Sequence, residues 1–316
     1  MNDRPKIGIS TCLLGKNVRY DGGHKLDRFL RDVVGAFVDW APVCPEVECG
    51  MPIPRESLRL VGDAENPRLV TTRTGMDKTD QMLTWARERL QQLDQENLCG
   101  YIFKSKSPSS GMRGIKVYDS NNIPSPRGVG IFARAFMERF PNMPVEDEGR
   151  LNDAALRENF IERIFVYKRW KSFIEQDGSP KGLVDFHTDH KLLFMSHSPT
   201  LLRELGGLVA GVKDMEKSGL LDVYSTTMMK ALKLLATVKK NVNVLQHILG
   251  YFKKQLQPDE KQEMLTVIDN YHRGYIPLIV PITLLNHFTK KFDVDYLKRQ
   301  VYLNPHPIEL MLRNHV

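Results

Sequence analysis

The stretch KIGISTC (Lys6 to Cys12) decides the fold of the first half of the chain, because it is a short apolar strand that ends in a cysteine and a polar loop. AFVDWAPV before Cys44 and LCGYIFKS before Ser-Pro-Ser-Ser-Gly repeat this arrangement. Patterns of helical period occupy residues 76–93 and 129–140. Residues 1–150 therefore predict an α/β domain with a mostly parallel, Rossmann-like sheet.

The character of the sequence changes near residue 150, and nearly everything beyond has helical period. Pro258 and Asp259 are placed as a helix start, and Ser198-Pro199 as a helix end. Residues 151–316 predict an all-α domain that accompanies the α/β domain.

The composition is that of a globular protein, with 316 residues, 41% hydrophobic and 26% charged. The N-terminus lacks the pattern of a signal peptide, and no apolar run reaches the roughly 20 residues that span a bilayer. We therefore expect a cytoplasmic protein without a membrane partner. The net charge is +7, with most of the excess beyond residue 150. This excess suits an anionic ligand, including nucleic acid bound by the basic C-terminal domain, or is simply a solvated basic surface.

The carboxyl ends of the three predicted strands would bring four polar segments together if the strands are neighbours. These segments contain Cys12, Cys44, Cys49 and residues 107–110. Three thiolates suit an iron–sulfur cluster or zinc, and clustered cysteines in a reducing compartment indicate metal binding or catalysis. Glu46 could serve as a general acid or base. The alternative is that these cysteines are inert thiols at strand ends.

Several motifs resemble known families. STCLLGKNVRYDGGHK, VCPEVECGMPIPR and KSKSPSSG together resemble the DUF523 family, which includes thiouracil desulfidases. RENFIERIFVYKRWK and LVDFHTDHKLLFMSHSP resemble the DUF1722 (YbgA-like) family. Together they look like the long, two-domain form of the desulfidases, and the resemblance covers nearly the whole chain.

The resemblance implies a [4Fe-4S] cluster held by three cysteines, whose open iron takes the sulfur of a thiolated pyrimidine. The implied reaction is non-redox: 4-thiouracil, or its nucleotide form, and water give uracil, or UMP, and hydrogen sulfide. Cys12 and Cys44 match the first two cysteines of the family, and Glu46 matches its motif glutamate. Ser107 matches the first serine of the third motif, where it could position water or donate to the pyrimidine; a serine that caps a turn is the alternative.

The third motif departs from the family, because Ser110 stands where the family has its third cysteine. A serine is a poor ligand for an iron–sulfur cluster. We therefore predict that Cys49, which shares a loop with Cys44, supplies the third bond; Cys99 is the rival. If no third thiolate is available, the chain is a non-catalytic protein that binds zinc or nucleic acid.

An anionic nucleotide substrate would need cations close to these motifs. We predict that Arg19, Lys104 and Lys106 bind substrate, together with the hydroxyls of Ser109 and Ser110, because arginine and lysine suit phosphate. The sequence carries no indication of oligomeric state.

Three histidines of the second half have helical spacing, namely His187, His190 and His197. One helix face could carry a metal, but no HExxH arrangement accompanies them. We favour hydrogen-bonded structural histidines at a domain interface over a metal site.

Overall fold

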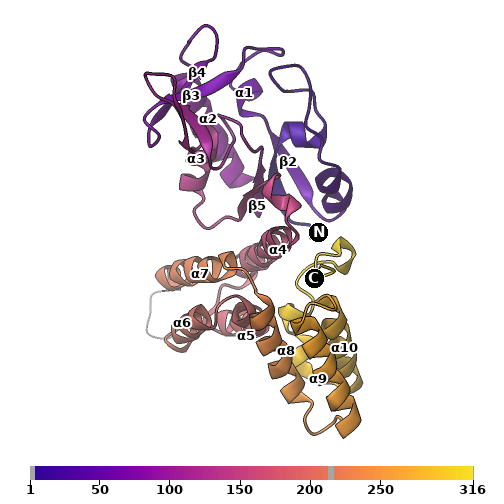
Figure 1. The fold of residues 1–316 in the computed structure, drawn as a ribbon. Helices are drawn as coiled ribbons and strands as arrows, with labels where there is room; N and C mark the ends of the chain where they lie inside the picture. The colour runs from indigo at the N-terminus through magenta and orange to yellow at the C-terminus, as the bar shows by residue number, and fades with distance from the viewer. Residues whose placement is uncertain (1–3, 213–216, 316) are drawn as a thin grey trace. The chain divides into compact units, whose positions relative to one another are not determined.

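The computed structural model describes residues 4–212 and 217–315 of the chain. The chain divides into two compact units, Met1–Asn152 and Asp153–Val316 (Figure 1). The first unit contains the described strands and the second is helical, so the predicted fold classes of the two halves are confirmed.

Sheet A of the first unit contains the three strands that the sequence predicts and one more. Its order is β2 (Asp39–Val43), β1 (Lys6–Ser10), β5 (Gly100–Phe103) and β8 (Val145–Asp147). All three pairs of neighbours are parallel. Since β1, β2 and β5 are adjacent and run in one direction, the loops that follow them leave the sheet at a single edge.

Sheet B is a second, mixed sheet that the sequence does not predict. Its order is β4 (Pro67–Thr71), β3 (Leu58–Gly62), β6 (Ile115–Tyr118) and β7 (Pro124–Gly128). β3 pairs antiparallel with β4 and parallel with β6, and β6 pairs antiparallel with β7. Prolines at the start of β4 and inside β7 weaken the strand pattern along the sequence, as expected for the outer strands of a sheet.

Aromatic packing fixes one of the two long helices of the first unit to sheet A. α2 (Thr79–Gln95) and α3 (Ile131–Arg139) fall in the two segments where the sequence predicts helices. The Tyr101 ring of β5 lies 4.6 Å from that of Phe136 and 5.9 Å from that of Phe132, both on α3. On the neighbouring strand, a Cβ atom at Gly8 would lie only 2.2 Å from the Tyr101 ring, so this close approach requires glycine.

The second unit is built from helices that follow one another through short connections. They are α4 (Ala154–Gln176), α5 (Pro180–His197), α6 (Pro199–Ala210), α7 (Lys217–Lys233), α8 (Val238–Tyr251), α9 (Pro258–His272), α10 (Ile279–Lys291) and α11 (Asp295–Lys298). Asp153 caps α4 and Ser179 caps α5 by accepting hydrogen bonds from backbone N–H groups of the first turn. α5 ends at His197 and α9 begins at Pro258, as the sequence predicts.

Short elements complete the first unit. α1 (Pro45–Glu48) and a 3-10 turn over Thr11–Leu14 follow β2 and β1 directly.

None of the helices within residues 4–212 and 217–315 is both long enough and apolar enough to span a bilayer.

Candidate functional site

A cavity of about 380 Å³ lies where β1, β2 and β5 end. We call it the strand-end cavity. It is lined by nine of the ten residues that the sequence nominates, the exception being Cys49; the nine are Cys12, Arg19, Cys44, Glu46, Lys104, Lys106, Ser107, Ser109 and Ser110. Segments far apart along the chain meet here because the three parallel strands are neighbours and end at the same edge.

Two thiols line the cavity. Cys12 is buried in the 3-10 turn after β1, and Cys44 is the residue before α1, where its backbone N–H donates to the Glu48 carboxylate at 2.7 Å. Burial raises the pKa of Cys12 to about 11, with a further increase from Cys44 nearby. Burial also raises the pKa of Cys44. Without a metal ion, both groups are therefore neutral thiols at pH 7. A metal ion that bound them would have to displace their protons.

Cys49 and Cys99 lie outside the lining of the cavity. Cys49 follows α1, and its Sγ donates to the carbonyl of Glu46 at 3.3 Å. Cys99 precedes β5, and its N–H bonds to the carbonyl of Lys6, so it lies at the opposite end of sheet A from the cavity. Within residues 4–212 and 217–315, no three His, Cys, Asp or Glu side chains are grouped closely enough to hold a metal ion.

The carboxylate of Glu46 is held on both oxygens. Oε2 accepts from the guanidinium of Arg55, which has a side chain only 5% exposed and donates through Nε at 3.0 Å. Oε1 accepts from the Ser109 hydroxyl at 2.7 Å. Arg55 also donates to the carbonyls of Val18 and Pro52, so the guanidinium is fixed on the loops around it. Glu46 is thus presented to the cavity as an oriented carboxylate.

A relay of hydroxyls connects Ser107 to Glu46. The Oγ atoms of Ser107 and Ser109 lie 3.0 Å apart, and the single hydroxyl hydrogen of Ser109 is already donated to Glu46. Ser107 must therefore be the donor in the bond between the two serines. The N–H of Ser110 donates to Ser107 at 3.1 Å and completes the chain. Ser107, predicted as a catalytic residue, and Ser109, predicted as a substrate contact, thus form one network with Glu46.

The nominated cations differ in how they are held. Lys104 forms an ion pair with Glu148, which also accepts from the N–H and hydroxyl of Ser105. Arg19 lies 3.5 Å from the carboxylate of Asp21. Lys25 lines the cavity as well, although the sequence does not nominate it; its N–H donates to the carbonyl of Cys12. The Gly22-Gly23 turn, which folds this segment back toward Cys12, is the signal that could have found Lys25.

The three histidines of α5 have separate partners within the described residues. His187 bonds to the Tyr224 hydroxyl, His190 to the carbonyl of Phe186, and His197 to Glu162. Burial lowers the pKa of His187 to about 4 and that of His190 to about 3, so both rings are neutral at pH 7. These contacts agree with structural histidines rather than with a shared metal site.

Comparison with known proteins matches a different family on each side of the boundary between the two units. A family model described as 2-thiouracil desulfurase matches residues 7–148, and a model described as a protein of unknown function (DUF1722) matches residues 191–307. "Uncharacterized protein YbgA" of Escherichia coli (strain K12) is 31% identical over 155 residues, which are 48% of this chain and 90% of that protein. "Uncharacterized protein YbbK" of Bacillus subtilis (strain 168) is 30% identical over 110 residues, which are 33% of this chain and 72% of that protein.

A similar solved structure is that of the "[4Fe-4S]-dependent thiouracil desulfidase TudS". It is 31% identical in sequence, with a TM-score of 0.39, over 49% of this chain and 97% of that chain.

Proposed function

This chain belongs to the 2-thiouracil desulfurase family over residues 7–148 and to the DUF1722 family over residues 191–307, and we propose that it removes sulfur from a thiolated pyrimidine by hydrolysis. Water replaces the sulfur atom: 4-thiouracil, or its nucleotide form, gives uracil, or UMP, and hydrogen sulfide, with no change in oxidation state. One observation carries the proposal. The strand-end cavity joins two thiols, an oriented carboxylate and a hydroxyl relay.

The donor set of this site supplies two of the three thiolates that a [4Fe-4S] cluster would need. Cys12 and Cys44 offer two soft sulfur donors in one cavity. Ser110, which stands where the family has its third cysteine, lines the same cavity but offers only a hydroxyl. We propose that Cys49 supplies the third thiolate, which requires its Sγ to leave the carbonyl of Glu46. A cluster held by these three thiolates would supply an iron able to bind a sulfur atom of the substrate.

Glu46 is the residue that we propose to move the proton. Arg55 holds Oε2, and Ser109 occupies one lone pair of Oε1, so the second lone pair of Oε1 can accept a proton from the attacking water and return it to the departing sulfide. Ser109 donates to this oxygen and Ser107 donates to Ser109, so the two hydroxyls hold the carboxylate in one orientation.

The cations of the cavity suit a nucleotide form of the substrate. We propose that Arg19 and Lys106 face the phosphate, while Lys104 contributes through its ion pair with Glu148. The half-apolar walls, including Val43 and Leu58, would cover the base.

Activity of anaerobically prepared, iron-loaded protein tests the proposal. We expect release of hydrogen sulfide and formation of uracil from 4-thiouracil, with turnover reduced by roughly 100-fold or more in Glu46→Gln. Glu88→Gln, the same substitution at an exposed position of α2, should retain full turnover. If the loaded protein releases no sulfide from the base or its nucleotide, the proposal is wrong.

A second candidate function rests on Ser110, which leaves only two thiols in the cavity lining. A protein of this kind would bind zinc or no metal at the strand-end cavity, and the basic excess beyond residue 150 would serve to bind nucleic acid. Analysis of iron and acid-labile sulfide in anaerobic preparations separates the two candidates. A colourless preparation that contains only zinc favours the second.

A further inference from the structure

The helical unit contains a cavity of its own, of about 290 Å³, which the proposed desulfuration does not use. Residues of α4, α8 and the segment after α9 line it. Leu235, Val238, Ile276 and Leu278 supply apolar walls, and Tyr271 is the aromatic residue of the lining. A volume at the small end of the range for ligand pockets, with apolar walls and a few polar groups, suits a small molecule.

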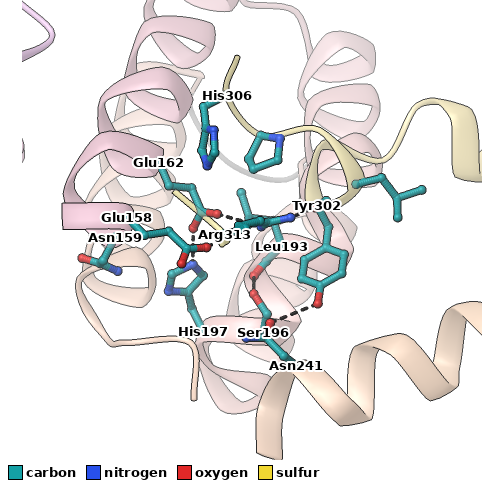
Figure 2. A network of polar contacts seen from close by, with 12 residues as sticks. Glu158, Asn159, Glu162, Leu193, Ser196, His197, Asn241, Tyr302, His306 and Arg313 are labelled. Carbon is teal, nitrogen blue, oxygen red and sulfur yellow. Dashed lines mark hydrogen bonds and ion pairs between the residues drawn. The ribbon is translucent and has the colours of Figure 1, made fainter. Parts of the chain in front are cut away.

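A chain of hydrogen bonds ends in this cavity with a free donor. The Tyr302 hydroxyl donates to Asn241 Oδ1 at 3.0 Å (Figure 2), and Asn241 Nδ2 donates to the Tyr271 hydroxyl at 3.2 Å. The oxygen of Tyr271 is therefore an acceptor in this chain, and its own hydrogen has no acceptor in the described parts of the protein. Because each bond polarises the next, the terminal O–H is a good donor for a ligand carbonyl.

Carboxylates supply acceptors in the same cavity. Glu158 and Glu162 of α4 both line it, and both point toward Arg313 (Figure 2). Each carboxylate oxygen has two lone pairs, so Glu158 can still accept from a ligand while it holds Arg313 and His315. Its side chain is 17% exposed against 4% for Glu162, which makes Glu158 the more accessible of the two.

The two carboxylates that line the cavity are already paired with basic side chains. His197 faces an oxygen on each side of its ring, Glu162 at 2.6 Å and the carbonyl of Leu234 at 2.5 Å. Each ring nitrogen of His197 therefore has a partner inside the protein and is not available to a ligand. Glu162 is paired with His197 and Arg313, and Glu158 is paired with Arg313 and His315. An anionic ligand would have to lie beside these two carboxylates in a largely apolar cavity, whereas a neutral ligand would not.

From these three features we propose that the cavity of the helical unit binds a small, neutral cyclic amide of the size of a pyrimidine base. The Tyr271 hydroxyl donates to a ring carbonyl, a Glu158 oxygen accepts from a ring N–H, and the apolar residues cover the ring. An adjacent carbonyl and N–H in one planar ring is the chemical group that uses both the free donor and the free acceptor.

Methyl-resolved NMR of the full-length chain tests the proposal with uracil as the probe. The methyl groups of Leu235, Val238, Ile276 and Leu278 report on this cavity, and those of Val18 and Leu58 report separately on the strand-end cavity. Binding in the helical unit is thereby measured whether or not the N-terminal unit is a desulfidase. We expect saturable shifts of the first set with uracil and none with 1,3-dimethyluracil, which keeps both carbonyls but has no N–H.

Two variants assign the binding to the named groups. Tyr271→Phe removes the donor and should weaken uracil binding by roughly 3- to 10-fold. Ala155→Leu places a larger side chain at an exposed position of the cavity lining and should abolish binding; it decides the matter if Tyr271→Phe folds poorly. The proposal is overturned if the cavity methyl groups do not shift with uracil, if 1,3-dimethyluracil shifts them equally, or if folded Tyr271→Phe and Ala155→Leu bind like the parent protein.

Discussion

Replacement of Glu162 by glutamine should destabilise the helical unit strongly. Burial alone would raise the pKa of this carboxyl, but the hydrogen bond and charge of His197 and the charge of Arg313 outweigh it and lower the pKa from 4.5 to about 2. A decrease of this size corresponds to roughly 3 kcal/mol of folding free energy. Loss of one member of a buried ion pair typically costs about 3–5 kcal/mol, so Glu162→Gln should lower the free energy of unfolding by about 3 kcal/mol.

The pH dependence follows from the direction of the shift. A carboxyl whose pKa is lower in the folded state contributes its full stabilisation above the pKa of the unfolded state. That contribution is lost as the pH falls from about 4.5 toward about 2. The difference in stability between the parent protein and Glu162→Gln should therefore be constant near pH 7 and decrease over this acid range.

Urea denaturation followed by tryptophan fluorescence measures the free energy of unfolding of the helical unit. The chain has 3 tryptophans, and Trp170 is the one in the helical unit, so Trp40→Phe and Trp85→Phe leave it as the sole reporter. Glu260→Gln is the matched control, because this glutamate pairs with Lys291 at the surface and glutamine can still serve in its capping box. If Glu162→Gln moves the Trp170 transition no further than Glu260→Gln does, the reasoning about the buried network is refuted.

Three further substitutions test the first unit. Cys49→Ala should remove most of the iron and the visible absorption of an anaerobically loaded protein, because a cluster needs its third thiolate. The control Cys99→Ala should keep both. Full iron content in Cys49→Ala would contradict the assignment. Arg55→Gln should lower turnover by roughly 100-fold, since the acid–base carboxylate loses its orientation, while Arg127→Gln on an exposed strand should not; equal turnover would rule out the positioning role. Gly8→Ala should destabilise the first unit by about 1–3 kcal/mol, measured by urea denaturation, because the added methyl group meets a buried aromatic ring; an unchanged midpoint would contradict this packing argument.

Three of the four strands of sheet A, namely β1, β2 and β5, and the longer helices could be predicted because they carry their own periodicity. Strand β1 reads as an apolar run that stops at a cysteine, and α2 and α3 repeat apolar residues at helical spacing. Sheet B could not be predicted in the same way. Its outer strands β4 and β7 contain prolines, and its central pairing joins β3 with β6, which is distant in the chain.

The residues of the strand-end cavity were nominated from local motifs, but their connections were not. Arg55 is the last residue of the motif VCPEVECGMPIPR, and only the fold shows that it holds Oε2 of Glu46 while Ser109 holds Oε1. For Cys49, the sequence suggests a role that its contacts in the structure do not show. Its place in the sequence makes it the natural third ligand, whereas its Sγ lies on the carbonyl of Glu46 in the described structure. That assignment stays a prediction for the iron measurement to decide.

By itself the sequence determined the α/β and all-α halves and the chemistry available at the strand ends, because periodicity and residue type are local properties of a chain. Only the tertiary structure decided which of these groups face one another. The neighbouring order of β2, β1 and β5 brings Cys12, Cys44 and the serine loop into one cavity, and the fold of the helical unit turns Tyr271 and Glu158 toward another. Contacts of this kind join residues tens to hundreds of positions apart, and a single sequence contains no local pattern that records them.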